Sequence, residues 1–308
     1  MKIVTLTLNP AFDVHCFAEN FKPYHESIVD ITSKEAGGKG VNVSRALVSN
    51  GVDNLAVAIV GKDNGEEFVK ALEKDGLTVA PVYTEGRIRE NITLHEKENP
   101  ETRISFNGFS CSAEILEQVK KSVGKVDKET IITFTGSIPK GIKVEQVLSL
   151  LDVFKKDGAK VVIDSRSVSL AQLTEFKPWL IKPNKDETEN YTGKVINSVQ
   201  DAAEIAKSIY NQGVENVVVS LGGDGAVLAS DKGVFHAVTP KIEVVSTIGA
   251  GDSMIAGFIE ATANGFSVER ALVRAVAFGS SACMMQGTLP PSKENVEYLS
   301  EKITLASL

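Results

Sequence analysis

Short runs of β-branched and other apolar residues alternate along the chain with longer segments of helical periodicity. The apolar runs cover residues 2–8, 54–61, 130–136, 159–165 and 214–223. The helical segments cover residues 40–51, 64–76, 144–157 and 199–212. Strands of a parallel sheet give such continuous apolar runs, because helices bury both of its faces. We therefore predict an α/β fold whose central sheet is mostly parallel and lies between layers of helices.

Two segments interrupt this alternation. Residues 14–35 mix polar and apolar side chains with little helical period, whereas residues 87–108 alternate as a hairpin does, with Glu98, Asn99 and Pro100 at the turn. We predict that both segments form a small protruding β-layer, a lid or an interface; a surface hairpin without function is the alternative. No long Pro/Ser-rich linker divides the 308 residues, so one domain from residue 1 to residue 308 is expected.

Charge and cysteine content limit the partners and the compartment. The formal net charge of -7 argues against a broad nucleic-acid surface but is compatible with a small anionic ligand. Cys16, Cys111 and Cys283 are far apart and lack metal-binding spacing, which is typical of free thiols in a reducing cytosol. The first residues form no signal-peptide core, and the chain has no run of about 18 apolar residues. We expect a cytoplasmic protein without a membrane partner.

The sequence STIGAGDSMIAGF, residues 246–258, places its most flexible backbone and a carboxylate at the start of a predicted helix. Unpaired N–H groups and the positive end of the helix dipole meet there and favour a bound phosphate. Gly249, Ala250 and Gly251 leave room for a ligand close to the backbone. Asp252 is either a helix cap or a base that removes a proton from an attacking hydroxyl, and spacing alone leaves both open.

The second glycine-rich stretch, EAGGKGVNVSRAL at residues 35–47, also precedes a predicted helix. Its spacing fits neither the Walker A loop nor the dinucleotide fingerprint. It presents Lys39 and Asn42 either to a polar ligand or, as a simple helix-entry turn, to solvent.

Two further stretches combine a local structural signal with a possible ligand. In WLIKPNKDET, Asn184 and Glu187 form a capping box, and the same oxygens suit a magnesium ion bound through water. In VVVSLGGDGAVL, Ser220 ends a strand and a turn from Gly222 to Gly225 leads into the next one. A hairpin explains this turn, and a nucleotide lying across strand ends would equally need small residues there.

Together these stretches resemble a known family. TLNPAFD, AGGKGVNVSRAL, FTGSIPKG, IKPNKDE, SLGGDGA and TIGAGDSMIAGF occur in the order typical of the ribokinase-like, phosphofructokinase-B sugar kinases, from about residue 6 to about residue 287. The resemblance implies a three-layer α/β/α sandwich with a small β-sheet lid. It also implies ATP with Mg²⁺ as cofactors and phosphoryl transfer to a sugar hydroxyl.

The resemblance assigns roles to matching positions. It implies that Asp252 is the base and that the N–H groups of Gly249, Ala250 and Gly251 form an anion hole. It implies that Asn184 and Glu187 organise magnesium and phosphate. The implied ATP contacts are Ser220, Gly222, Gly225 and Thr247. The implied contacts to sugar hydroxyls are Asp13, Gly38 and Asn42.

The choice of sugar rests on the same resemblance. Lys39 within GGKG resembles the subgroup that acts on phosphorylated sugars, and Arg89, Arg103 and Ser137 match its contacts to the substrate phosphate. Members of this subgroup act on fructose 1-phosphate or tagatose 6-phosphate, and the stretch RENITLH with TRISFNG is closer to the former. The implied product is fructose 1,6-bisphosphate. Glu26 stands where some members that act on fructose 6-phosphate have a lysine, and this difference argues against fructose 6-phosphate as the substrate.

Two other classes of function remain to be compared. A sugar-phosphate sensor that has lost catalysis is disfavoured by the intact Asp252 and its glycines. A Rossmann dehydrogenase is excluded because TLNPAFD, and not a glycine fingerprint, follows the first strand. The lid strands further predict a homodimer formed by edge pairing.

Overall fold

The computed structural model describes residues 1–19, 21–96 and 102–308. The predicted hairpin turn at Glu98, Asn99 and Pro100 lies outside this part of the chain. Among the described residues, ten strands form the main sheet in the order β14-β13-β12-β11-β10-β9-β8-β1-β4-β5. The strands are β1 (Lys2–Thr7), β4 (Leu55–Gly61), β5 (Thr78–Thr84), β8 (Thr130–Thr135), β9 (Lys160–Asp164), β10 (Leu180–Ile181), β11 (Asn216–Ser220), β12 (Ala226–Ser230), β13 (Gly233–Val238) and β14 (Thr304–Ser307).

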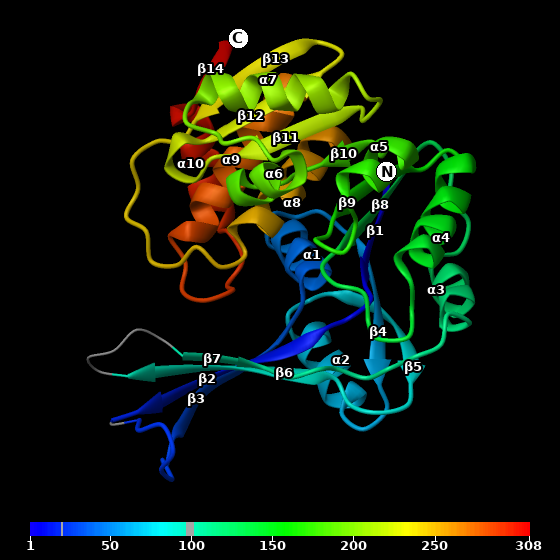
Figure 1. Cartoon of the computed structure of the whole chain (residues 1–308), viewed down its shortest axis with the longest axis vertical. Helices are drawn as coiled ribbons and strands as arrows, with labels where there is room; N and C mark the ends of the chain where they lie inside the picture. The colour runs from blue at the N-terminus through cyan, green and yellow to red at the C-terminus, as the bar shows by residue number, and fades with distance from the viewer. Residues whose placement is uncertain (20, 97–101) are drawn as a thin grey trace.

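The seven strands from β5 to β11 in this order are mutually parallel, and β12, β13 and β14 extend the sheet in antiparallel pairing. Helices lie on both faces (Figure 1). They are α1 (Lys39–Ser49), α2 (Gly65–Lys74), α3 (Ile115–Val123), α4 (Val144–Lys156), α5 (Leu170–Phe176), α6 (Lys185–Thr192), α7 (Val199–Tyr210), α8 (Ala250–Ala263), α9 (Val268–Cys283) and α10 (Lys293–Lys302). The predicted three-layer α/β/α fold is confirmed.

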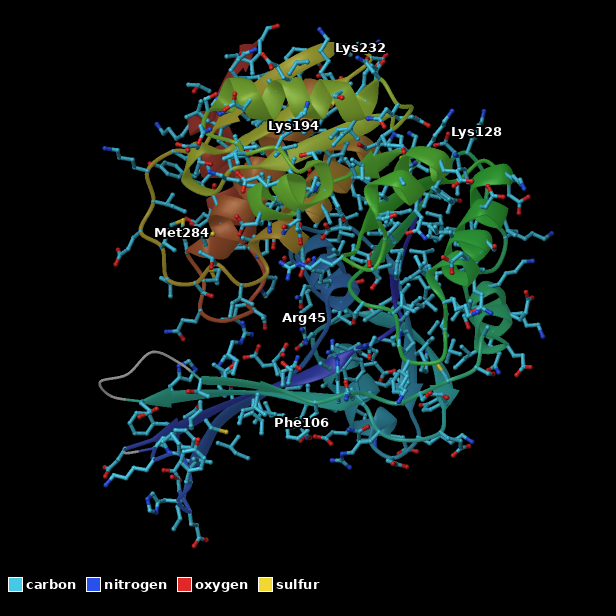
Figure 2. The ribbon with its side chains drawn as sticks, in the orientation of Figure 1. Arg45, Phe106, Lys128, Lys194, Lys232 and Met284 are labelled. Atoms are coloured by element: carbon cyan, nitrogen blue, oxygen red, sulfur yellow. The ribbon has the colours of Figure 1, made fainter. Side chains whose placement is uncertain are left out.

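The apolar runs are continuous because successive side chains of a strand enter opposite cores. In β8, Ile131 packs with the core under α1, α8, α9 and α10, while Ile132 packs with the core that includes α3, α4, α5 and α7. Figure 2 shows side chains filling these layers, with Lys128 and Lys232 at the periphery. No helix in the described ranges is long and apolar enough to cross a membrane.

A second sheet projects from the main body (Figure 1). Its strands are β3 (Asp30–Gly37), β2 (Ala11–Ala18), β6 (Arg89–Glu96) and β7 (Thr102–Ser105), in that order. The predicted small β-layer is therefore confirmed, and β6 and β7 pair antiparallel as a hairpin does. We call this four-stranded sheet the lid. Its alternation gives it one polar face, which carries Asp13 and Asn91, and one apolar face, which carries Phe12 and Val14.

The segment between α9 and α10, residues 284–292, contacts three other parts of the molecule. Ser246 donates a hydrogen bond from Oγ to the carbonyl of Gly287 (3.3 Å), and Thr288 donates from Oγ1 to Oε2 of Glu35 in the lid (2.5 Å). Asn50, at the end of α1, donates from Nδ2 to the carbonyl of Pro291 (3.2 Å). One connecting segment therefore contacts the lid, α1 and the residues that precede α8.

Candidate active site

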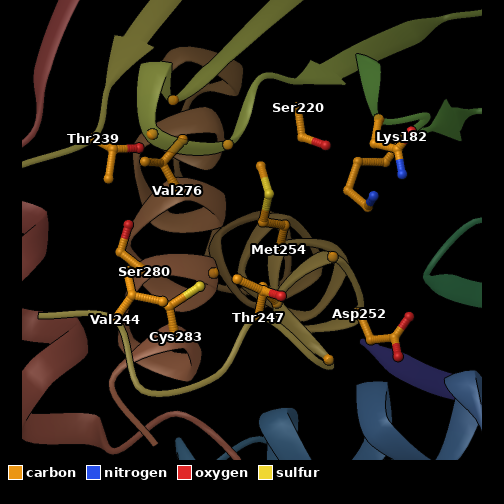
Figure 3. A pocket seen from close by; sticks show the side chains of 18 of the residues that line it. Lys182, Ser220, Thr239, Val244, Thr247, Asp252, Met254, Val276, Ser280 and Cys283 are labelled. Carbon is orange, nitrogen blue, oxygen red and sulfur yellow. The ribbon is translucent and has the colours of Figure 1, made fainter. Parts of the chain in front are cut away.

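A cavity of about 680 Å³ opens at the carboxyl ends of β9, β10 and β11, where ligands of parallel α/β sheets commonly bind. Its two ends differ in chemistry. Figure 3 shows Asp252 and Lys182 at one end and Val244, Ser280 and Cys283 at the other. The charged end is lined by Lys39, Asp164, Arg166, Lys182, Glu187 and Asp252. A molecule with one anionic and one apolar end fits this division.

The start of α8 lies in the wall of the cavity. Gly249 precedes the helix with a φ of 77°, in the left-handed region that glycine adopts readily. The N–H of Ser253 closes the first turn on the carbonyl of Gly249 (2.9 Å), and the N–H of Ala250 makes a longer bond to Thr247 (3.4 Å). A β-carbon at Gly251 would lie 3.1 Å from Nζ of Lys182. The glycine thus lets an ammonium group approach a helix N-terminus that already favours anions.

Asp252 lies in the first turn of α8 and is only 6% exposed. Its Oδ2 accepts a hydrogen bond from Nδ2 of Asn42 (2.9 Å). Burial raises the pKa of Asp252 to about 6, and the Lys39 ammonium and the Asn42 amide limit that rise. A carboxylate with this pKa is ionised at neutral pH and can still accept a proton effectively.

Lys39 bridges the charged end of the cavity. Its Nζ lies 3.0 Å from Oδ2 of Asp164, which is buried at the carboxyl end of β9. Burial lowers the pKa of Lys39, but the carboxylates of Asp164 and Asp252 outweigh it and raise this pKa above its usual value. The sequence placed Lys39 among the substrate-binding residues, and the structure places it beside Asp164, in the cavity.

The start of α6 forms the predicted capping box. The N–H of Glu187 donates to Oδ1 of Asn184 (2.8 Å), and the N–H of Asn184 donates to Oε2 of Glu187 (3.1 Å). The other oxygen of Glu187, Oε1, accepts from Nε of Arg166 (2.8 Å). Both residues of the box line the cavity, so capping and a ligand role are compatible.

The described residues contain no group of three or more His, Cys, Asp or Glu side chains that could enclose a metal ion. Glu187 and Asn184 offer carboxylate and amide oxygens, which suit a hard cation that keeps water and phosphate oxygens as its remaining ligands.

The turn between β11 and β12 lines the cavity with Ser220, Gly222 and Gly225. It pairs the strands as the predicted hairpin, with a short 3₁₀ turn at its tip. Gly225 is required by packing, because a β-carbon there would lie 1.9 Å from the carbonyl oxygen of Ala237. Gly222 has open space around it, so a ligand can approach its backbone. Thr247 also lines the cavity.

A second group of polar residues lies where the lid meets β1 and β8. Asn91 donates from Nδ2 to Oδ1 of Asp13 (2.9 Å), and Asn9 donates from Nδ2 to Oγ of Ser137 (3.0 Å). The guanidinium of Arg89 donates to the carbonyl of Asn9 (3.4 Å). Burial lowers the pKa of Arg89, and the carboxylate of Asp13 partly offsets this. We call the residues Asn9, Asp13, Arg89, Asn91 and Ser137 the lid cluster.

The lid cluster and Asn42 contain buried polar atoms without a partner. Within the described part of the chain, these are Oδ1 of Asn9, Asn42 and Asn91 and Nε of Arg89. Such atoms are costly when they stay unpaired, so several of them together indicate a polar ligand. Nearby glycines keep this region open, since a β-carbon at Gly37 would lie 2.6 Å from Oδ2 of Asp13. Gly38, with a φ of 127°, precedes α1 and so positions Asn42.

Arg103 is separated from the lid cluster. It is exposed on β7 and lies opposite Thr93, four residues along β6 from Arg89. The sequence placed both arginines at one phosphate, whereas the register leaves Arg103 farther out on the lid. Conversely, Asp164, Arg166 and Lys182 line the cavity but were not singled out from the sequence. Asp164 ends one buried strand and Lys182 follows another, a signal that could have found them.

Comparison with known proteins agrees with this geometry. The model of the pfkB family carbohydrate kinases matches residues 7–295. A protein named 1-phosphofructokinase from Escherichia coli K12 is 32% identical over 259 residues, covering 84% of this chain and 83% of the relative. A 1-phosphofructokinase from Bacillus subtilis 168 is 33% identical over 284 residues, covering 92% and 93%.

A solved structure of phosphofructokinase-2 from Escherichia coli, in complex with substrates and products, superimposes with a TM-score of 0.89 at 28% identity, covering 98% of this chain and 99% of that one. Fold, site and relatives agree, and the chain belongs to the pfkB family of carbohydrate kinases.

Proposed function

We propose that this kinase transfers the terminal phosphoryl group of ATP to the 6-hydroxyl of D-fructose 1-phosphate, giving D-fructose 1,6-bisphosphate and ADP. One observation carries the proposal: the buried Asp252, with a pKa of about 6, lines the charged end of the cavity and accepts a hydrogen bond from Asn42. Oδ1 of that asparagine has no partner among the residues that the structure describes. A base at that place serves a hydroxyl that approaches from the lid and a phosphate that approaches from the cavity.

The chemistry follows from this placement. Asp252 accepts the proton of the 6-hydroxyl as the new oxygen–phosphorus bond forms and the bond from phosphorus to ADP breaks. The N–H groups at the start of α8, from Gly249, Ala250 and Gly251, face the transferred group and gain from the helix dipole. Lys39 and Lys182 add positive charge at the same end of the cavity.

The donor nucleotide is assigned to the cavity, with its base at the apolar end and its phosphates at the charged end. Ser220, Gly222, Gly225 and Thr247 are its expected contacts. Mg²⁺, held by Glu187 and Asn184 through water, would neutralise phosphate charge.

The acceptor is assigned to the lid cluster. Asp13 can accept hydrogen bonds from two hydroxyls, and the unpaired oxygens of Asn9, Asn42 and Asn91 can accept others. Gly38 is an expected backbone contact of the sugar. Arg89 and Ser137 are the expected contacts of the sugar phosphate, with Arg103 in a peripheral role. The names of the relatives from Escherichia coli and Bacillus subtilis favour fructose 1-phosphate as this sugar.

The test is ADP release with several acceptors. We expect kcat/KM for fructose 1-phosphate to exceed that for tagatose 6-phosphate and for fructose 6-phosphate by about tenfold or more. Asp252→Asn should lower turnover at least about a hundredfold while ATP still binds, because only the base is lost. A preference for another ketose phosphate would replace the substrate. Binding of fructose 1-phosphate without ADP release would indicate a sensor.

We also propose that the lid mediates a homodimer, and that lid and main sheet act as one domain. The apolar side of the lid exposes Ile31 (67%) and Ile104 (44%), which a second copy could cover. A monomer in light scattering at assay concentration would contradict this.

The three cysteines are free, which supports the expectation of a reducing, cytoplasmic compartment.

A further inference from the structure

Arg166 lies in the connection between β9 and α5 and reaches the charged end of the cavity. Its Nε donates to Oε1 of Glu187 at 2.8 Å. The two side chains differ in exposure: that of Glu187 is 11% exposed, whereas that of Arg166 is 77% exposed. A buried carboxylate therefore holds Nε of Arg166, while most of the arginine side chain is exposed.

Both carboxylate oxygens of Glu187 are occupied. Oε2 accepts from the N–H of Asn184 as part of the capping box, and Oε1 accepts from Arg166. The capping box fixes the carboxylate to the start of α6, so it in turn orients the guanidinium. An arginine held in this way loses less conformational entropy when it binds a further group.

The outer part of the guanidinium is available. In the described ranges Nη1 and Nη2 of Arg166 have no hydrogen-bond or ion-pair partner, although they carry four N–H donors in a planar fork. Such a fork matches the oxygens of a phosphate group. The surrounding charges agree, because Lys39, Lys182 and the N-terminus of α8 line the same end of the cavity.

We propose that Arg166 binds the outer phosphates of the donor nucleotide through its terminal guanidinium nitrogens, while Glu187 holds the side chain at the cavity. This inference rests on the proposed function, since it requires a nucleotide in this cavity. It gives Glu187 a second task, to position Arg166, in addition to any contact with a metal. It also means that part of the affinity for ATP does not depend on Mg²⁺.

The alternative is that Arg166 only neutralises Glu187. The two roles predict opposite changes. If Arg166 binds phosphate, its removal weakens nucleotide binding with or without Mg²⁺. If it only neutralises the carboxylate, its removal frees Glu187 for the metal and strengthens Mg²⁺-dependent binding.

Titration calorimetry of the full chain with ATP, ADP and AMP, each in Mg²⁺ and in EDTA, separates these roles. We expect Arg166→Ala to weaken ATP and ADP binding about tenfold or more in both buffers and to leave AMP binding within about twofold. Arg166→Lys should be intermediate, because it keeps the charge but not the fork. The matched control is Arg270→Ala, which removes one exposed arginine that lies outside the cavity and donates to the carbonyl of Ser300 (3.5 Å).

Unchanged ATP affinity in Arg166→Ala, or tighter binding in Mg²⁺ alone, would overturn the inference and leave the proposed function standing. A wild-type protein that binds neither ATP nor ADP would overturn both. Thermal unfolding of each variant without ligand checks that weaker binding does not reflect a loss of folded protein.

Discussion

The two sides of the site are built differently. At the charged end of the cavity, the carboxylates are paired within the protein: Asp164 with Lys39, and Glu187 with both Asn184 and Arg166. In the lid cluster, by contrast, Asn9, Arg89 and Asn91 each keep a buried polar atom without a partner in the described part of the chain. Since unpaired buried polar atoms are unfavourable, the lid side depends on its ligand to complete it.

The difference follows from how each side is assembled. The cavity uses strand ends and helix starts, where free N–H groups and caps arise from local structure. Pairs between distant segments occur on both sides, from Lys39 to Asp164 across 125 positions in the cavity and from Asn91 to Asp13 across 78 positions in the lid cluster. The cavity adds a helix start and a capping box to its long-range pair, whereas the lid cluster depends on its side chains alone. Binding energy on the lid side is therefore expected to be more sensitive to single side chains.

The sharpest way to test this contrast is Arg89→Ala. We expect the KM for the phosphorylated sugar to rise about tenfold to a hundredfold, because a charge-assisted contact to the acceptor is lost, with the KM for ATP nearly unchanged. Steady-state kinetics with each substrate varied gives both values.

Arg103→Ala is the control for this experiment, since Arg103 is exposed and four residues farther along the lid. Its effect should be several times smaller. Equal losses in the two variants, or a matching rise in the KM for ATP after Arg89→Ala, would contradict the separation of the two sides.

The pH dependence tests the residue at which the two sides meet. Asp252 must be ionised to accept a proton, and its pKa is raised to about 6 by burial. We expect kcat/KM to be constant above about pH 7 and to fall about tenfold per pH unit below about pH 6. A profile that stays flat down to about pH 5 would remove Asp252 as the base.

The smallest expected effect concerns stability. Folding raises the pKa of Asp252 above its unfolded value of 3.8, so the folded state binds this proton more tightly. The protonated carboxyl group therefore contributes stability that is present below about pH 4. This stability is lost as the pH rises, and the loss is complete above about pH 6, where the buried carboxylate is ionised. Asp252→Asn, which stays neutral, should raise the free energy of unfolding by about 3 kcal/mol at pH 8.

Denaturant unfolding at pH 8 and at pH 4 measures the last effect. The gain from Asp252→Asn should nearly vanish at the lower pH. A gain of equal size at pH 8 and at pH 4 would mean that the substitution acts through packing and that burial does not raise the pKa of Asp252.

The sequence predicted what depends on local pattern. The α/β alternation, the small β-layer, the capping box of Asn184 and Glu187 and the hairpin after Ser220 are all present. It predicted less well what depends on register between distant strands. Arg89 and Arg103 are similar in the sequence, but only the pairing of β6 with β2 and β7 decides which one lies beside Asp13.

Residues such as Arg166 had no local signature, because the neighbouring stretch IDSRSVS is unremarkable as a loop. Its position became informative only when β9 and β10, adjacent in the sheet, brought it to Glu187.

The segment of residues 284–292 has a further consequence. This segment is hydrogen-bonded to Glu35 in the lid and to Ser246, three residues before Gly249. A movement of the lid over a sugar would therefore also act on the residues that lead into α8. One segment, residues 284–292, thus connects the lid with the start of α8. The affinities for the two ligands are therefore expected to depend on each other.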